Sequence, residues 1–355
     1  MKPLPLQTTV TAARQGREAR AAAHLPPDRP DRGRGGIAVR HAPVPGRVCP
    51  LGYRYPATVF NRPAEVCTST LYVVGGLYGN VEALHAIEAL YAREATGCVM
   101  IFNGDFHWFD ADPAQFTAIN AAVYRHRALR GNVETELASD DSSAGCGCAY
   151  PAHVDDADVD RSNAILERLR ETARACGPAR QALESLPMHA VARVGRARVA
   201  IVHGDAESLA GWGFDAALLT RPDRQAWLQR VFEEAQVDVF SSSHTCTPAL
   251  HVLAAGEGGA PRAVINNGAA GMSNYPGTRF GVITRISTEP APPGVPVIHE
   301  VLVRGVRVQQ VRVLFDDATW QRRFLSVWPE GSDAHRSYWQ RIVAGPTGGQ
   351  ACAPI

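Results

Sequence analysis

The stretch VMIFNGDFHWFD, residues 99–110, is an apolar run that ends at Gly104 and Asp105. The same arrangement recurs in three later stretches, which are ALRGNVE (128–134), RVAIVHGD (198–205) and VDVFSSSHTCTP (237–248). Open α/β sheets place their sites beyond the ends of such strands, where side chains far apart in sequence meet. We therefore expect the polar residues that follow these runs to form one cluster, namely Asp105, Asn132, His203 and His244.

From Leu71 onward, short apolar runs alternate with helical patterns. The expected strands there are 71–74, 98–102, 199–202 and 237–241, with a helix after Asn80 as its N-cap. This order favours parallel strands joined by helices. In the last third, the expected strands 263–265, 280–286, 298–303 and 306–313 follow one another through turns, which is typical of antiparallel hairpins. The prediction is an α/β fold with two mixed β-sheets sandwiched between helices.

The order and types of the four motifs resemble those of the calcineurin-like metallophosphoesterases. That family carries D-x-H, G-D-x-x-D/N, G-N-H/D-D/E, a single His and G-H-x-H. The resemblance implies an α/β/β/α sandwich and a divalent metal ion, which would be Mn, Fe or Zn. It also implies that one ion is held by four residues, Asp105, Asn132, His203 and His244.

Three positions depart from the family pattern, and all belong to the other metal ion of that family. In LYVVGGLYGNVEALHAIEAL, residues 71–90, Gly76 stands in place of the Asp and Tyr78 in place of the His. Cys246 stands in place of the last His of G-H-x-H. Elsewhere Val133 takes the position of the His in G-N-H-D/E, which protonates the leaving group in many members. The resemblance therefore implies one firmly bound ion per chain.

The function expected from this pattern is metal-dependent hydrolysis of phosphomonoesters or phosphodiesters, in which a metal ion activates water. A phosphorylated small molecule is the expected partner. Three weaker candidates for substrate contact are Tyr78, His107 and Asp205. His107 is included because alternate residues of an extended segment share a face, which would place it on the side of Asp105.

Two other functions fit the same residues. One metal ion of the family has lost every ligand that it does not share with the other ion. This loss also fits a catalytically degenerate protein that binds a phosphorylated ligand or a partner. Tyr78 and Cys246 either fill the space left by that metal or act as replacement ligands, and with iron they suggest redox chemistry.

The sequence also predicts how the chain is divided. Residues 1–46 are expected to be a disordered extension, rich in Arg, Ala and Pro and without the apolar region of a signal peptide. Residues 47–315 are expected to form the main domain, with an insertion at 134–186 that caps the site. Residues 316–355 are expected to form a helical tail that packs on the core.

Composition excludes several classes of partner. The 36 basic and 35 acidic residues give a net charge of +1, so no strong field attracts nucleic acid or an anionic membrane. No apolar run approaches the roughly 20 residues that span a bilayer. The eight cysteines are scattered through a long chain, which predicts a reducing cytoplasm rather than a disulfide framework.

Overall fold

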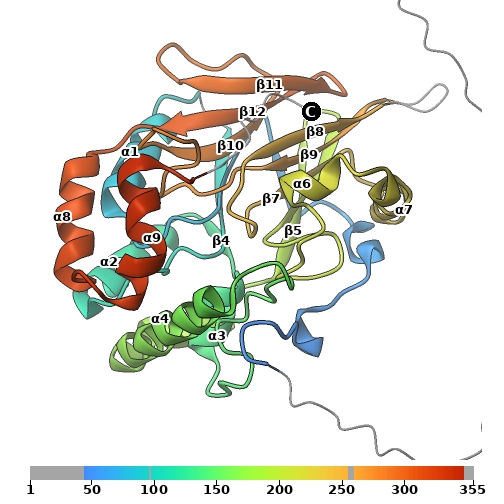
Figure 1. Ribbon diagram of the computed structural model, residues 1–355. Helices are drawn as coiled ribbons and strands as arrows, with labels where there is room; N and C mark the ends of the chain where they lie inside the picture. The colour runs from blue at the N-terminus through green and yellow to red at the C-terminus, as the bar shows by residue number, and fades with distance from the viewer. Residues whose placement is uncertain (1–43, 96, 255–259, 348–355) are drawn as a thin grey trace, which may run out of the picture. The chain divides into compact units, whose positions relative to one another are not determined.

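The computed structural model describes residues 44–95, 97–254 and 260–347, and in these residues twelve strands form two six-stranded sheets (Figure 1). The first sheet has the order β1 Val66–Thr68, β5 His189–Val194, β6 Ala197–Val202, β7 Val239–Ser242, β9 Arg262–Asn266 and β8 Ala249–Leu253. The second has the order β11 Val297–Val303, β12 Val306–Val313, β10 Gly281–Ser287, β2 Thr70–Val74, β3 Cys98–Asn103 and β4 Arg127–Leu129. The predicted two-sheet α/β sandwich is confirmed.

Both sheets are mixed, as the sequence predicted. The neighbouring pairs β2–β3, β3–β4, β6–β7 and β7–β9 are parallel. The later strands pair in antiparallel fashion, in β8–β9, β10–β12 and β11–β12. Each of the eight predicted strands is present, whereas β1, β4, β5 and β8 were not predicted. Two of the missed strands, β1 and β4, have only three residues, too few to show a periodic pattern.

Alternation along the strands builds the layers of the core. In β2, Leu71 and Val73 lie in the apolar layer between the sheets, whereas Tyr72 and Val74 face the other way. In β6, Val199 points into the same central layer. Successive side chains of a strand point to opposite faces of its sheet. Since both faces carry buried apolar residues, each sheet must be covered on its outer face as well as on the face toward the other sheet. Helices supply that cover, with α1, α2, α8 and α9 on one side in Figure 1 and α6 and α7 on the other.

The helices have these bounds: α1 Val81–Tyr91, α2 Pro113–Val123, α3 Asn132–Ala138, α4 Asp156–Ala175, α5 Gly177–Glu184, α6 Ala216–Leu219, α7 Gln225–Ala235, α8 Asp317–Val327 and α9 Asp333–Ala344. Short 3₁₀ helices lie at Leu51–Tyr53, Ala57–Phe60 and Pro222–Arg224. The predicted N-cap of α1 is confirmed, since the side-chain oxygen of Asn80 accepts a hydrogen bond of 3.0 Å from the backbone N–H of Ala83.

The 134–186 region contains most of α3 and all of α4 and α5, and it contacts the helical tail. The Nε of Arg161 in α4 donates a 2.7 Å hydrogen bond to Ser337 Oγ in α9. Of the extension predicted at 1–46, residues 1–43 lie outside the described residues. Within 44–46, the backbone N–H of Gly46 donates to Ala144 O at 2.8 Å.

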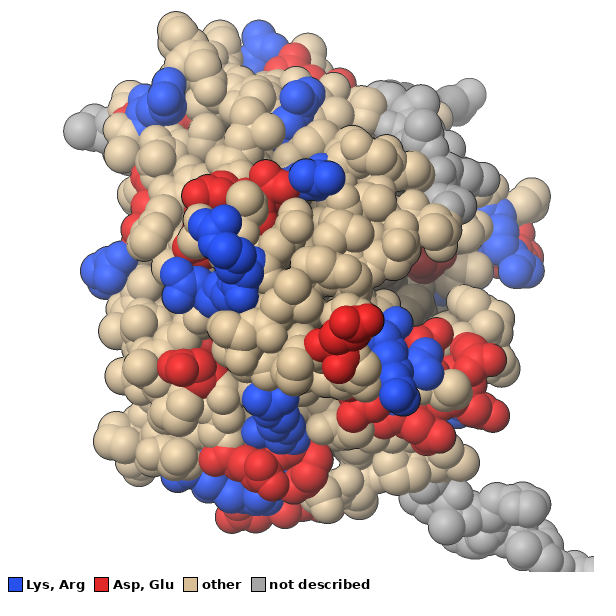
Figure 2. Space-filling model, turned by 60° about the vertical axis from the view of Figure 1, so that its left-hand side comes forward, with Lys and Arg blue, Asp and Glu red and all other residues tan. Residues whose placement is uncertain are grey.

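Figure 2 shows basic and acidic side chains interspersed on one face of the molecule, in agreement with the nearly neutral net charge. The seven cysteines in the described residues are free thiols. Among the helices described, none is both long enough and apolar enough to cross a membrane.

Candidate metal site

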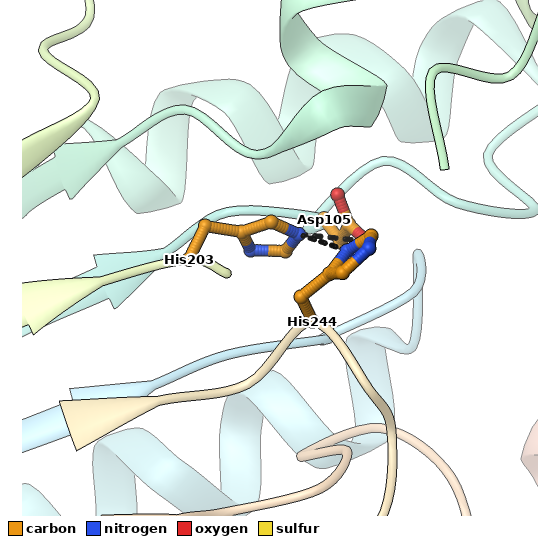
Figure 3. Close-up of side chains that lie close together, drawn as sticks. All are labelled: Asp105, His203 and His244. Carbon is orange, nitrogen blue, oxygen red and sulfur yellow. Dashed lines mark hydrogen bonds and ion pairs between the residues drawn. The ribbon is translucent and has the colours of Figure 1, made fainter. Parts of the chain in front are cut away.

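Four loops bring polar side chains together at the ends of strands from both sheets. Asp105 follows β3, Asn132 begins α3 just beyond β4, His203 follows β6, and His244 lies two residues beyond the end of β7. Figure 3 shows Asp105, His203 and His244 pointing toward one another. All four side chains are buried. The structure thus brings together the four residues that the sequence singled out.

The Nε2 atom of His203 lies at the centre of the cluster. It is 3.3 Å from Asp105 Oδ2, 3.1 Å from Asn132 Oδ1 and 3.2 Å from His244 Nδ1. One ligand atom from each of Asp105, His203 and His244 lies within 4.8 Å of the others. Four potential ligand atoms therefore surround one small volume.

Hydrogen bonds to backbone carbonyls fix which atoms face this volume. His203 Nδ1 lies 2.9 Å from Asn103 O, and His244 Nε2 lies 3.0 Å from Cys148 O. Because a carbonyl only accepts, these nitrogens carry hydrogen, and the opposite nitrogens have lone pairs when the rings are neutral. The amide of Asn132 donates to Cys146 O at 3.0 Å, which turns its oxygen inward. One carboxylate, one amide oxygen and two imidazoles fit a divalent transition metal.

Without an ion, a proton can occupy the centre of the cluster. Burial is the largest influence on the pKa of Asp105 and would raise it, but His203, His244 and the backbone N–H of Val133 together hold the pKa below its usual value. Burial would lower the pKa of His203, but Asp105, the carbonyl of Asn103 and Glu134 together raise it above its usual value. Burial and the neighbouring His203 lower the pKa of His244 to about 4. Because metal ligands must be deprotonated, the raised pKa of His203 means that a metal ion would compete with protons at this imidazole.

Close approach of the Asp105 and Asn132 loops requires glycine at two positions. A Cβ atom on Gly131 would lie 2.3 Å from Asp105 Oδ1. A Cβ atom on Gly104 would lie 2.7 Å from His203 Nδ1, and the φ of Gly104 is +77°. Both contacts are too short for carbon, so the two glycines let the ligand loops touch.

Gly131→Ala is expected to weaken metal binding and to lower the free energy of unfolding by about 1–3 kcal/mol, as overpacking of a filled interior does. Denaturant unfolding and metal titration measure the two effects. Gly52→Ala is the matched control, because a Cβ there would have no neighbour within 4 Å. Equal stability and equal metal affinity of the two variants would contradict the packing argument.

Glu134 supports the site and was missed by the sequence reasoning. Its buried carboxylate accepts hydrogen bonds from the backbone N–H groups of Asp105 at 2.7 Å, Phe106 at 2.9 Å and Gly131 at 2.9 Å. One side chain thus ties together the loops that carry Asp105 and Asn132. Its position in the sequence could have indicated this role, because a Glu three residues after a helix N-cap often accepts a hydrogen bond from the N-cap backbone N–H.

Tyr78 and Cys246 contact each other beside the cluster. The Tyr78 hydroxyl lies 2.6 Å from Cys246 Sγ. The Tyr78 ring folds over Gly76, where an added Cβ would lie 3.0 Å from the ring carbon Cζ. Burial is the main reason that the pKa of Tyr78 is raised well above its usual value, so the phenol keeps its proton. These contacts favour the interpretation that Tyr78 and Cys246 fill space rather than bind a second ion.

The side chains of two of the weaker candidates, His107 and Asp205, make other contacts. His107 does not face the side of Asp105: its ring is fully buried, lies 2.9 Å from Asp110 Oδ2 through Nδ1 and stacks on Phe116. The reason is that Asp105 has a φ of +54°, so the segment is not extended and alternate residues do not share a face. The Asp205 carboxylate accepts backbone N–H groups of its own loop, from Glu207 at 2.9 Å and Ser208 at 3.0 Å. Neither side chain lines the pocket described next.

A pocket of about 180 Å³ opens beside the cluster. Asp105, Asn132 and His244 form part of its wall. Half of the remaining wall comes from the 134–186 region, the loop near residue 212 and α9, and the other half from the loops around the cluster. These residues are Tyr78, Trp108, Val133, Cys148, Tyr150, Trp212, Thr245, Cys246, Tyr338 and Arg341. A ligand in this pocket would touch the cluster, several aromatic rings and one guanidinium.

Two of the solved structures that resemble this chain bear on its fold. One is a metallophosphoesterase from Sphaerobacter thermophilus, with a TM-score of 0.51, 16% sequence identity, and coverage of 79% of this chain and 100% of that one. The other is a hypothetical protein from Pyrococcus horikoshii OT3, with a TM-score of 0.50, 16% identity, and coverage of 78% and 99%. None of the protein-family models and none of the curated protein sequences matches the chain. Similarity at this identity shows a shared fold.

Proposed function

On the premise that this chain has the calcineurin-like metallophosphoesterase fold, we propose that it hydrolyses phosphate esters with one divalent metal ion. The observation that carries the proposal is the convergence of four potential ligand atoms, one from each of Asp105, Asn132, His203 and His244. In the last three residues, the side-chain N–H donors bond backbone carbonyls, so the acceptor atoms face the site. The substrate is a phosphorylated small molecule, because the pocket beside the cluster is compact.

Each residue has a separate part in this proposal. The four ligands hold the ion, while Asn103 O and Cys148 O fix the orientation of the two imidazoles through their outer nitrogens. Such an ion, chosen from Mn, Fe or Zn, supplies positive charge to phosphoryl oxygens and lowers the pKa of a water. Glu134 holds the loop that presents Asp105.

The leaving group receives no proton from residue 133. Val133 lines the pocket at the position where the family motif carries an acid, and its side chain has no proton to give. We therefore expect the fastest turnover with esters whose leaving groups are weakly basic, such as p-nitrophenyl phosphate.

Hydrolysis of p-nitrophenyl phosphate tests the proposal directly. The chain loaded with Mn²⁺, Fe²⁺ or Zn²⁺ is expected to release p-nitrophenolate, and the chelator-treated chain is expected to be inactive until metal is restored. If none of the metal-loaded forms hydrolyses phosphate monoesters or diesters, the hydrolase proposal is wrong.

A second function is favoured by the packing of Tyr78 over Gly76. These two residues stand where the family motif has ligands of a second metal ion, and the Tyr78 ring fills that space. In this alternative the chain binds a phosphorylated ligand without hydrolysing it. It predicts that a phosphate ester raises the melting temperature of the metal-loaded chain while the ester remains intact. Release of product during the same incubation would exclude it.

Metal binding is expected to stabilise the folded chain. An ion that binds only the folded state at 100 times its Kd adds about 2.7 kcal/mol to the free energy of unfolding. Thermal melting with Mn²⁺ and with a chelator measures the difference. A variant without His203 is expected to show no shift, and an equal shift in that variant would place the ion elsewhere.

A further inference from the structure

Arg341 of α9 is the one Lys or Arg among the described residues that line the pocket. Its Nε donates to Ser273 O at 2.8 Å, and its Nη2 donates to Cys246 O at 2.7 Å. Two backbone carbonyls therefore hold the guanidinium in place before any ligand arrives. Neither hydrogen bond uses Nη1, so within the described residues the two N–H groups of Nη1 and one N–H group of Nη2 remain as donors for a ligand.

This guanidinium lies on the Tyr78 side of the pocket. Its acceptor Cys246 follows His244 by two residues, and the Cys246 thiol contacts the Tyr78 hydroxyl. Asp105 and His244 line the same pocket as Arg341. With a metal ion bound at the cluster, the pocket would offer two places for negative charge, one at the ion and one at the guanidinium.

We propose that the Nη1 and Nη2 atoms of Arg341 bind two non-bridging oxygens of the substrate phosphoryl group, and that this makes the site selective for phosphate monoesters. The inference rests on the proposed function. A monoester has three non-bridging oxygens, so two can meet the guanidinium fork while the third faces the cluster. A diester has only two, so it cannot give two oxygens to the guanidinium and a third to the cluster. Paired N–H donors are suited to this task because they match phosphate geometry.

The size and walls of the pocket agree with a compact monoester. Its volume of about 180 Å³ is close to the roughly 150 Å³ of an apolar cavity that accommodates benzene. Tyr150, Trp212 and Tyr338 line it with aromatic rings. An ester with a single-ring leaving group fits this description, so p-nitrophenyl phosphate is a suitable probe.

The competing interpretation gives Arg341 a purely structural role. Its hydrogen bonds to Ser273 O and Cys246 O also attach α9 to two loops. A structural role predicts that its loss lowers stability and harms all substrates equally. A phosphoryl-binding role predicts a loss that depends on the number of free phosphoryl oxygens.

The test compares Arg341→Ala and Arg341→Lys with Arg336→Ala, a control at an exposed position of the same helix. Arg341→Ala is expected to lower kcat/KM for p-nitrophenyl phosphate by about 10-fold to 100-fold, as loss of hydrogen bonds to a charged group does. The effect on bis(p-nitrophenyl) phosphate is expected to be several times smaller. Metal content is expected to be unchanged, added guanidinium to restore part of the lost activity, and Arg341→Lys to be intermediate.

Binding of inorganic phosphate to the metal-loaded chains, measured by titration calorimetry, is the second readout. Weaker binding by Arg341→Ala than by Arg336→Ala supports the inference even if the wild-type chain hydrolyses neither ester, in which case only the hydrolase proposal fails. Unchanged phosphate affinity overturns the inference, as does an equal loss on both esters without rescue by guanidinium.

Discussion

Replacing His203 with Ala is expected to lower the affinity of the chain for Mn²⁺ by more than about 100-fold and to abolish hydrolysis of phosphate esters. Changes to groups that merely orient a ligand already cost 10-fold to 100-fold in metal affinity. His203 is itself a candidate ligand, and its Nε2 lies within 3.3 Å of atoms from Asp105, Asn132 and His244. Metal titration of the purified variant measures the first effect, and release of p-nitrophenolate measures the second.

Removal of a buried ring also costs stability, so the variant needs a control for folding. His85 on α1 is exposed, and His85→Ala is expected to keep wild-type metal affinity and turnover. Circular dichroism shows whether the His203 variant is folded at the assay temperature. A folded His203→Ala chain that binds metal and turns over substrate like the wild type would refute the assignment of the site.

Glu134→Ala is expected to lower the free energy of unfolding by about 3 kcal/mol, the second large effect in the chain. Each buried N–H group that loses its acceptor costs about 1–3 kcal/mol, and the carboxylate serves the N–H groups of Asp105, Phe106 and Gly131. Part of this cost is offset, because burial raises the pKa of Glu134 and so disfavours its charged form. Denaturant unfolding of the metal-free chains measures the difference.

The same variant is expected to bind metal more weakly, since the Asp105 loop loses its attachment. Glu171→Ala on α4 is the control, because that side chain is exposed and its loss is expected to change the unfolding free energy by less than about 0.5 kcal/mol. If Glu134→Ala were as stable as Glu171→Ala, the hydrogen bonds of Glu134 would not be what holds the loop.

The fold and the four-residue cluster were predictable because both depend on short local patterns. Asp105, Asn132, His203 and His244 each come soon after an apolar run, and the ends of neighbouring strands meet in space. The strands with strong patterns were found for the same reason. Those that were missed include HAVARV in β5 and ALHVL in β8, where polar or small residues interrupt the apolar pattern.

The remaining features depend on contacts that no local pattern encodes. Arg341 reaches the pocket because α9 packs near the His244 loop, about a hundred residues earlier in the chain, and the sequence gives no signal for that contact. His107 was misplaced because an extended backbone was assumed, whereas Asp105 adopts a positive φ. The sequence alone allows Tyr78 to be either a metal ligand or a residue that fills space, and the packing of its ring over Gly76 favours the second.

Metal stoichiometry tests most directly whether the four-residue cluster holds a single ion. The metal-free chain is incubated with Mn²⁺, Fe²⁺ or Zn²⁺, freed of excess ion and examined by elemental analysis together with His203→Ala. One ion per chain is expected in the wild type and none in the variant. Two ions per wild-type chain, or one ion retained in both proteins, would contradict this expectation, and so would the absence of metal from the wild type.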